Sequence, residues 1–252
     1  MRISPLLVVE HEDQCPPGWM GEWLREAGAD LDVTRPYAGD TLPADLASHS
    51  GMLVLGGEMG AHDDATHPWL ADVKRLVRSA AADGTPVLGI CLGHQLAAVA
   101  LGGEIEVNRH GQQIGVLGVG WTAAAYDDPL LAPLAALGSD AARAPAVQWN
   151  NDVVARLPEG AADLAHTARG ELQAARLAPS VWGVQWHPEV GAEIIGTWAD
   201  HDRDDAAERG VDLDARIAEV AAARPRLRAT WRVLADRFAG LCRDGRAAVE
   251  PR

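Results

Sequence analysis

The sequence predicts an α/β protein with an open, mostly parallel, twisted sheet flanked by helices. Through the first half of the chain, short apolar runs alternate with stretches of helical periodicity, which is the pattern of parallel strands joined by crossover helices. Pro and Gly stand at the borders of these segments, where helix starts and left-handed caps are expected. The 252 residues are enough to bury a full core, so one large domain with a possible appendage is expected.

The first half of the chain contains four strand candidates and three helix candidates. Pro68 is suited to the first position of a helix, and Gly84 and Gly102 stand just beyond expected helix ends. The expected strands are 5–10, 31–34, 51–55 and 86–90. The expected helices are 18–27, 68–82 and 92–101.

From about residue 104 the pattern changes to strands separated by turns, which predicts antiparallel pairs in this part of the chain. The candidates are 114–122, 162–168, 171–177 and 181–186. We therefore expect residues 1–198 to form the main domain.

Residues 199–252 change to acidic and then arginine-rich helix formers, and are expected to form a helical C-terminal extension. Pro225 predicts a break between two helices, 212–223 and 226–241. Apolar residues recur at helical spacing in the second helix, so one face should pack on the main domain. The alternative is a partner-docking helix or a homodimer contact. These apolar residues are Leu227, Trp231, Leu234 and Phe238.

Composition excludes several classes of protein. A net charge of −14 argues against non-specific binding to nucleic acid or to an anionic membrane surface. Three widely spaced cysteines, Cys15, Cys91 and Cys242, do not form a disulfide framework of the secreted kind. The apolar run near the N-terminus is too short for a signal peptide or a membrane span, so a cytoplasmic location is expected.

Metal and phosphate sites are not expected. The histidines other than His94 and His187 lack the spacing of metal ligands, so we predict no metal. No glycine-rich loop is followed by Lys-Ser or Lys-Thr, as a phosphate-binding loop would be, and we predict no cofactor. His11, Glu12 and Asp13 follow the first strand, and a solvated loop is favoured over a place in a crevice. Structural roles are favoured for His94 and for the cysteines other than Cys91.

Cys91 is the strongest candidate for chemistry. It stands between an apolar strand and a helical stretch, with Gly89 and Gly93 on either side. A sharp strand-to-helix turn exposes the residue at the turn and places free N–H groups and the positive end of the helix dipole beside it. Both effects favour the thiolate, which is the nucleophile.

A cysteine nucleophile needs a base, and the base needs an orienting group. An apolar strand ends at His187, and Glu189 follows two residues later. Pro188 favours extended geometry at His187, so the two side chains should project to one side. Oxyanion donors are expected from the N–H of Leu92 and from the Gly56-Gly57 loop.

These motifs identify a family by resemblance. The run Gly-Ile-Cys-Leu-Gly-His-Gln around Cys91, together with Gln-Trp-His-Pro-Glu around His187, resembles the class I (triad type) glutamine amidotransferases, which have a flavodoxin-like fold. It is most similar to stand-alone proteins like the amidotransferase domain of GMP synthetase. The resemblance implies that Cys91, His187 and Glu189 hydrolyse L-glutamine through a γ-glutamyl thioester. It also implies that Gly57 and Leu92 bind the oxyanion.

The same resemblance places Gln95 against the glutamine substrate and implies that ammonia is passed to an acceptor. No synthetase domain is visible, so a separate synthetase subunit is the expected partner. Glu58, Asn150 and Asn151 replace the Pro, His and Gly that relatives often carry. Two alternatives therefore stay open: a γ-glutamyl hydrolase or peptidase acting on conjugates, and a catalytically silent regulatory or binding subunit.

Overall fold

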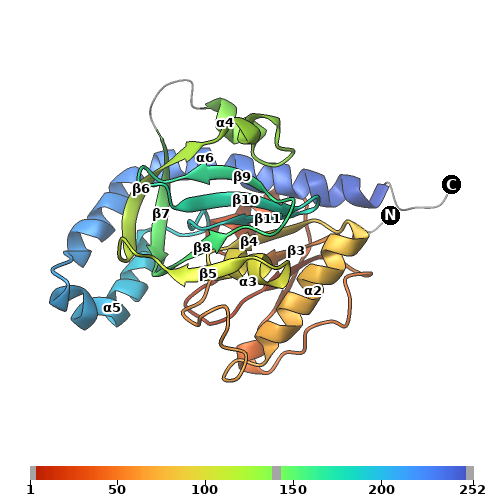
Figure 1. Cartoon of the computed structure of the whole chain (residues 1–252), viewed down its shortest axis with the longest axis horizontal. Helices are drawn as coiled ribbons and strands as arrows, with labels where there is room; N and C mark the ends of the chain where they lie inside the picture. The colour runs from red at the N-terminus through yellow and green to blue at the C-terminus, as the bar shows by residue number, and fades with distance from the viewer. Residues whose placement is uncertain (1–3, 138–142, 248–252) are drawn as a thin grey trace.

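The computed structural model describes residues 4–137 and 143–247 (Figure 1). The described strands are β1 (Leu6–Val9), β2 (Leu31–Thr34), β3 (Gly51–Val54), β4 (Val87–Ile90), β5 (Glu104–Val107), β6 (Gln113–Trp121), β7 (Ala144–Asn150), β8 (Asp152–Arg156), β9 (Ala162–His166), β10 (Leu172–Ala178) and β11 (Val181–Val184). The α-helices are α1 (Gly18–Glu26), α2 (Trp69–Asp83), α3 (Leu92–Ala100), α4 (Ala132–Leu137), α5 (Ala192–Glu208) and α6 (Leu213–Ala247).

The main sheet has the order β2-β1-β3-β4-β11-β10-β9-β6-β7 within these residues. The strands from β2 to β11 in this order are parallel, and each later neighbour pairs antiparallel. A second sheet pairs β5 with β8. These pairings confirm the predicted open, mostly parallel sheet and the antiparallel pairs of the second half.

Helices cover both faces of the parallel strands (Figure 1). In β1, Leu6 and Val8 belong to the apolar cluster that includes side chains of α1 and α6, whereas Leu7 and Val9 belong to the cluster that includes α2 and α3. All four side chains are buried, because successive residues of a strand point to opposite faces and both faces are covered.

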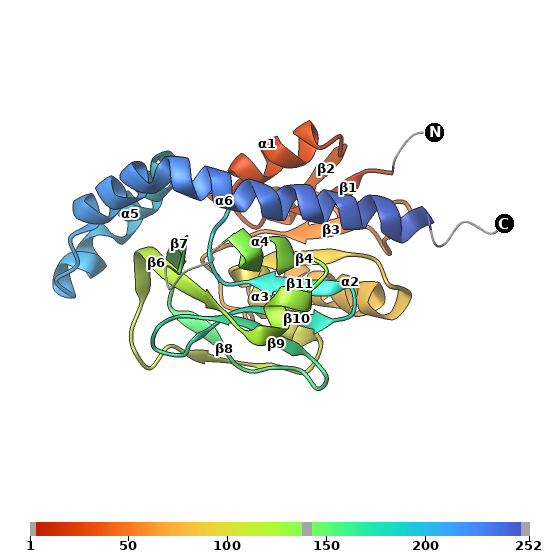
Figure 2. The same ribbon diagram turned by 90° about the horizontal axis from the view of Figure 1, so that it is seen from above.

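The C-terminal helix α6 runs along the length of the molecule (Figure 2). The predicted break at Pro225 is wrong, because Pro225 lies inside this helix. A proline removes one backbone hydrogen bond, but the following turns are held by burial of an apolar face. The side chains of this face are buried in the core, as the sequence predicted: Leu227, Trp231, Leu234 and Phe238.

The expected boundary after residue 198 falls within α5, so it would divide a helix. The division into residues 1–198 and 199–252 stays a prediction, and residues 248–252 lie outside the described part. None of the helices in the described residues is long and apolar enough to cross a lipid bilayer.

Trp231 joins α6 to the antiparallel part of the sheet, and we expect Trp231→Phe to lower stability by about 1–2 kcal/mol. Its Nε1 donates to the carbonyl of Pro145 at 3.0 Å, and its ring lies 4.8 Å from that of Trp186. Phenylalanine keeps most of the apolar volume but leaves this buried carbonyl without its donor. Urea unfolding of the two proteins measures the difference, and an unchanged midpoint would contradict this role.

Candidate active site

Cys91 lies at the turn between β4 and α3, where the sequence predicts it. Its backbone has φ 51° and ψ −107°, and it is the one non-glycine residue with positive φ among those the structure describes. Strain of this kind is typical of a nucleophile held on a sharp strand-to-helix turn. The flanking glycines allow the turn, because a Cβ on Gly89 would lie 2.4 Å from the carbonyl of Gly93.

His187 and Glu189 lie against this turn and form a buried pair. The Nδ1 atom of His187 is 2.6 Å from Oε1 of Glu189, and the two side chains are 3% and 2% exposed. Cys91 and His187 line the same cavity, and Cys91 contributes to raising the pKa of the His187 ring. The structure therefore brings the three predicted residues into one chain of contacts, from thiol to imidazole to carboxylate.

The charges in this chain favour a protonated imidazole. Burial alone would lower the pKa of His187, but the charges of Glu189 and Cys91, and hydrogen bonds with both, raise it to about 10. A charged imidazole near a cysteine sulfur is an arrangement found at cysteine nucleophiles.

Gln185 is a further polar neighbour of the sulfur, and sequence reasoning gave it no role. Its Nε2 donates to Sγ of Cys91 at 3.5 Å, and its side chain is fully buried. It precedes His187 by two residues, so the spacing that places Glu189 beside His187 could also have identified it. Gln95 lines the same site, and its Nε2 donates to the Asp152 carbonyl at 3.1 Å and to Gln185 Oε1 at 3.4 Å.

The two predicted oxyanion donors come from different elements. Leu92 begins α3, so its N–H has no intrahelical partner. Gly57 follows β3 and lines the cavity. A side chain at Gly56 would displace the histidine, because its Cβ would lie 2.9 Å from Cε1 of His187. The assignment of the donors stays a prediction, since it depends on where a substrate carbonyl binds.

A crevice of about 260 Å³ opens over Cys91 and His187. The favoured interpretation of residues 11–13 as a solvated loop is wrong for two of them: Glu12 lines this crevice, and His11 is fully buried. Burial, followed by the charge of His67, lowers the pKa of His11 to about 3. Cys15 also lines the crevice, and burial raises the pKa of its thiol above the usual range.

Trp198 and Asp202 are among the crevice residues that sequence reasoning missed, because distant segments bring them to the site. Trp149 lies in β7, whereas Trp198 and Asp202 come from α5. The indole Nε1 of Trp149 donates to Asp202 at 2.8 Å, and the Trp198 ring lies 4.7 Å from that of His187. No local pattern marks these residues.

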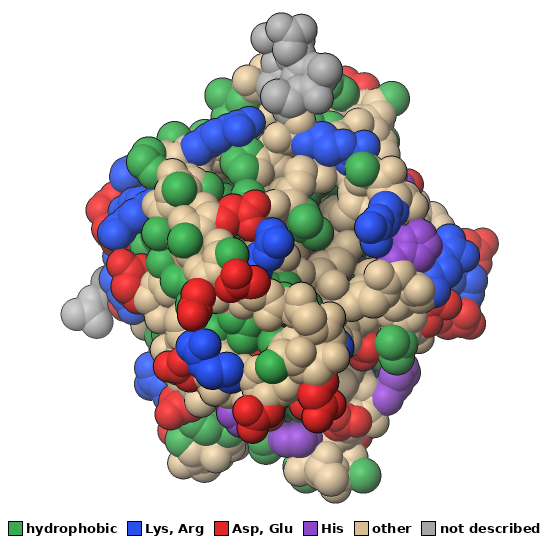
Figure 3. Space-filling model, turned by 90° about the vertical axis from the view of Figure 1, so that its left-hand side faces the viewer, with side chains coloured by type: hydrophobic (Ala, Val, Ile, Leu, Met, Phe, Trp, Pro, Cys, Tyr) green, Lys and Arg blue, Asp and Glu red, His purple; other side chains and the backbone are tan. Residues whose placement is uncertain are grey.

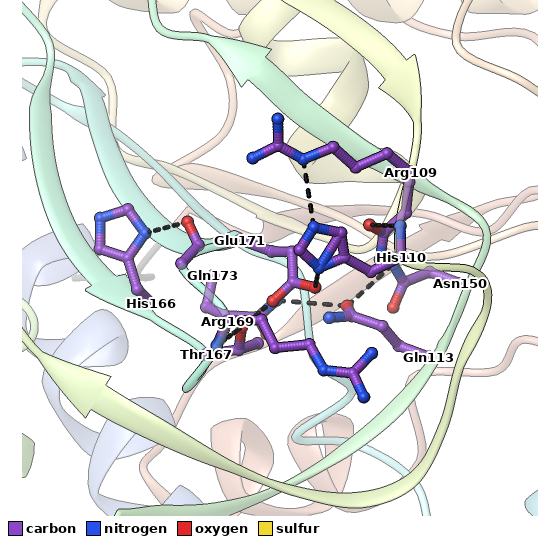
Figure 4. A network of polar contacts seen from close by, with 11 residues as sticks. Arg109, His110, Gln113, Asn150, His166, Thr167, Arg169, Glu171 and Gln173 are labelled. Atoms are coloured by element: carbon purple, nitrogen blue, oxygen red, sulfur yellow. Dashed lines mark hydrogen bonds and ion pairs between the residues drawn. The ribbon is translucent and has the colours of Figure 1, made fainter.

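Asn150 connects the crevice to a buried network of amides (Figure 4). Its Nδ2 donates to Gln113 Oε1 at 3.2 Å and to the Asp152 carbonyl at 3.1 Å. Gln173 also donates to Gln113, at 3.3 Å. These contacts hold Asn150 rigidly at the edge of the crevice.

An open α/β sheet whose strand ends bring a thiol, an imidazole and a carboxylate together defines a class of protein arranged for nucleophilic thiol chemistry. Comparison with known proteins identifies the family. The model of the glutamine amidotransferase class-I family matches residues 20–197. The chain therefore belongs to the class I glutamine amidotransferases.

The names of two relatives indicate different activities. One is a subunit of the glutamine-hydrolyzing GMP synthase of Methanosarcina barkeri, 33% identical over 172 residues, which cover 66% of this chain and 80% of that protein. The other is a γ-glutamyl-L-1-hydroxyisopropylamide hydrolase of a Pseudomonas species, 32% identical over 157 residues, covering 60% of this chain and 50% of that protein. The aligned region spans only 32% of the longer GMP synthase of Aeropyrum pernix.

A solved structure supports the fold. The glutamine amidotransferase of Thermotoga maritima superposes with a TM-score of 0.81 at 24% identity, over 95% of this chain and 99% of that one. This likeness covers α5 and α6 as well as the sheet.

Proposed function

We propose that this chain is a glutamine amidotransferase or glutaminase that hydrolyses the side-chain amide of L-glutamine. The observation that carries the proposal is the buried contact chain from Cys91 through His187 to Glu189, with 2.6 Å between imidazole and carboxylate. The family membership of the chain supports the same chemistry.

In the proposed reaction, the Cys91 thiolate attacks the γ-carbonyl carbon and the oxyanion is bound by the N–H groups of Leu92 and Gly57. His187 gives its proton to the leaving nitrogen, so ammonia departs and a γ-glutamyl thioester remains. His187 then accepts a proton from the water that attacks the thioester, so glutamate is released and the Cys91 thiolate and the protonated His187 are restored. Glu189 holds the ring and stabilises its charged form.

The proposal is tested by trapping the thioester. Native protein is incubated with L-glutamine, glutamate and ammonia are measured, and hydroxylamine is added to intercept the acyl enzyme. We expect equal amounts of glutamate and ammonia without the trap, and γ-glutamyl hydroxamate with it. Glutamate release with no hydroxamate would contradict a thioester.

We further propose that the ammonia acceptor is a separate protein. The Methanosarcina barkeri relative is itself named as one subunit of an enzyme, which supports this arrangement. A second candidate substrate class, γ-glutamyl conjugates, is favoured by the name of the Pseudomonas relative and by the lining of the crevice. Glutamate release from both classes separates the candidates.

Alkylation of Cys91 by iodoacetamide is expected to stay fast at pH values where an ordinary thiol, with a pKa of about 8.5, is protonated. The pKa of His187 is raised to about 10, so its positive charge persists beside the sulfur as pH rises toward that value. In His187→Asn, which lacks this positive charge, alkylation at neutral pH should be slower. Rates followed by mass spectrometry, with Cys91→Ala as the blank, measure this, and matching native and variant profiles would contradict it.

A further inference from the structure

We infer that the crevice favours γ-glutamyl amides whose leaving amine carries a second, positively charged group. This inference rests on the proposed thioester chemistry and names a substrate class for it. Its first observation is the charge of the crevice lining, which contains four carboxylates and, among the described residues, no lysine or arginine. These carboxylates belong to Glu12, Glu58, Asp152 and Asp202.

Among the residues that the structure describes, three of these carboxylates contact neutral groups or one histidine, and burial followed by the charge of Asp63 raises the pKa of the fourth, Asp152. Glu12 accepts from the neutral thiol of Cys15 at 2.9 Å, and Asp202 accepts from the neutral indole of Trp149. Glu58 lies 3.6 Å from Nε2 of the exposed His201. None of the four forms an ion pair with lysine or arginine among the described residues.

The surface of the protein differs from the crevice in this respect. Acidic and basic side chains lie interspersed on the face drawn in Figure 3. Exposed acids such as Glu22, Glu26 and Glu193 pair with arginines of α6. The crevice carboxylates have no lysine or arginine partner among the described residues, so they favour a local negative potential that a cationic ligand would neutralise.

Asn150 provides an independent observation that points to a ligand with N–H groups. Its side chain lines the crevice and is 5% exposed, and its Oδ1 has no hydrogen-bond partner among the described residues. The amide orientation is fixed, because Nδ2 donates to the Asp152 carbonyl, which can only accept. A buried acceptor without a donor costs about 1–3 kcal/mol, which a ligand N–H would offset.

Two indole rings complete the lining. Trp149 and Trp198 both border the crevice. Their Nε1 atoms are already bound, to Asp202 and to the Gln14 carbonyl, so the rings are held in place. Aromatic faces attract alkylammonium groups within about 6 Å, and the attraction grows where water is excluded. Carboxylates and indoles together suit an amine better than a neutral or anionic group.

The γ-glutamyl part is common to all γ-glutamyl amides, so its contribution to binding is the same for each. A difference in binding or turnover between these amides therefore reports on the leaving group. An anionic leaving group would add a negative charge to a crevice that is lined by four carboxyl groups. A cationic leaving group would lie among opposite charges. The chemistry is that of the proposed reaction: the C–N bond breaks, the thioester forms, and His187 gives its proton to the departing amine.

The test compares γ-glutamyl amides of 1,3-diaminopropane, n-butylamine and β-alanine, whose leaving groups are similar in size but cationic, neutral and anionic. We expect kcat/KM for the cationic amide to exceed that of the neutral one by about tenfold and that of the anionic one by about a hundredfold. Raising salt should shrink these ratios. Equal values for the three amides would overturn the inference but leave the thioester chemistry standing.

Binding provides a readout that does not depend on turnover. Affinities of the three amides for the Cys91→Ala protein, measured by calorimetry, should follow the same order. In this background Asp202→Asn and Glu58→Gln should each reduce the cationic-to-neutral ratio by about threefold or more. Asp204→Asn serves as the matched control, because Asp204 is an exposed acid on α5, the helix that also carries Asp202. It should leave the ratio of cationic to neutral affinity unchanged. An equal loss in the control would contradict a crevice effect.

Discussion

Cys91→Ala is expected to lower glutamate release from L-glutamine by about 10⁴-fold or more while leaving the fold intact. The sulfur is the atom that would form the thioester, and neither Gln185 nor His187 could replace it as a nucleophile at that position. The change removes one buried sulfur of a side chain that is 6% exposed, so it should cost little stability. Chemistry, rather than folding, should therefore account for the loss.

The matched control removes a different buried cysteine. Cys242 lies in α6, is 4% exposed, and belongs to the apolar core instead of the crevice. Burial raises the pKa of its thiol to about 12, so it should not react. Cys242→Ala should retain the proposed glutaminase activity while folded, as monitored by circular dichroism. Equal turnover by the native and Cys91→Ala proteins would exclude Cys91 as the nucleophile.

Four of the five parallel strands could be predicted from sequence because each is a short, continuous apolar run; β2, Leu-Asp-Val-Thr, is the exception. The strands β1 and β4 are buried on both faces, so nearly all of their residues are apolar and the sequence alone indicates a buried strand. β5 was missed for the opposite reason, whereas β7 and β8 were missed although Val147, Val153 and Val154 are buried. β5 reads Glu-Ile-Glu-Val and is largely exposed, so its pairing depends on a partner strand almost fifty residues away.

The break predicted at Pro225 shows where local rules give way to packing. A proline inside a helix costs about 3 kcal/mol, yet the turns that follow bury Trp231 and Phe238 completely. Burial of two large aromatic side chains outweighs the lost hydrogen bond. Intrinsic preference alone could not reveal this, because the buried surface is contributed by α1 and the sheet.

The residues of the candidate site also fall into two groups, those that local sequence predicts and those that only tertiary contacts bring to the site. Cys91, His187 and Glu189 were recognised because each depends on local geometry, either a strand-to-helix turn or an extended pair two residues apart. Trp198 and Asp202 were missed, because they belong to a helix that the sequence pattern did not assign to the site. Local motifs predict the nucleophile, whereas tertiary contacts determine what surrounds it.

Gly93→Ala is expected to destabilise the protein by about 3 kcal/mol and to lower glutaminase activity further than the loss of folded protein explains. A Cβ at this position would lie 2.2 Å from the carbonyl oxygen of Val54 and 2.8 Å from its carbonyl carbon. Both atoms are backbone of β3, so α3 must move away from the sheet. Because α3 begins at Leu92, that movement would displace the Leu92 N–H relative to Cys91.

The sign of the stability change in Gly93→Ala distinguishes a packing effect from an effect of helix propensity. Alanine is favoured over glycine within a helix by about 1 kcal/mol, so propensity alone predicts stabilisation. Gly196 in α5 provides the matched control, because a Cβ there would meet no atom within 4 Å. Gly196→Ala should raise the urea midpoint and Gly93→Ala should lower it. A Gly93→Ala protein as stable and active as native would show that close contact between α3 and β3 does not fix the position of the nucleophile.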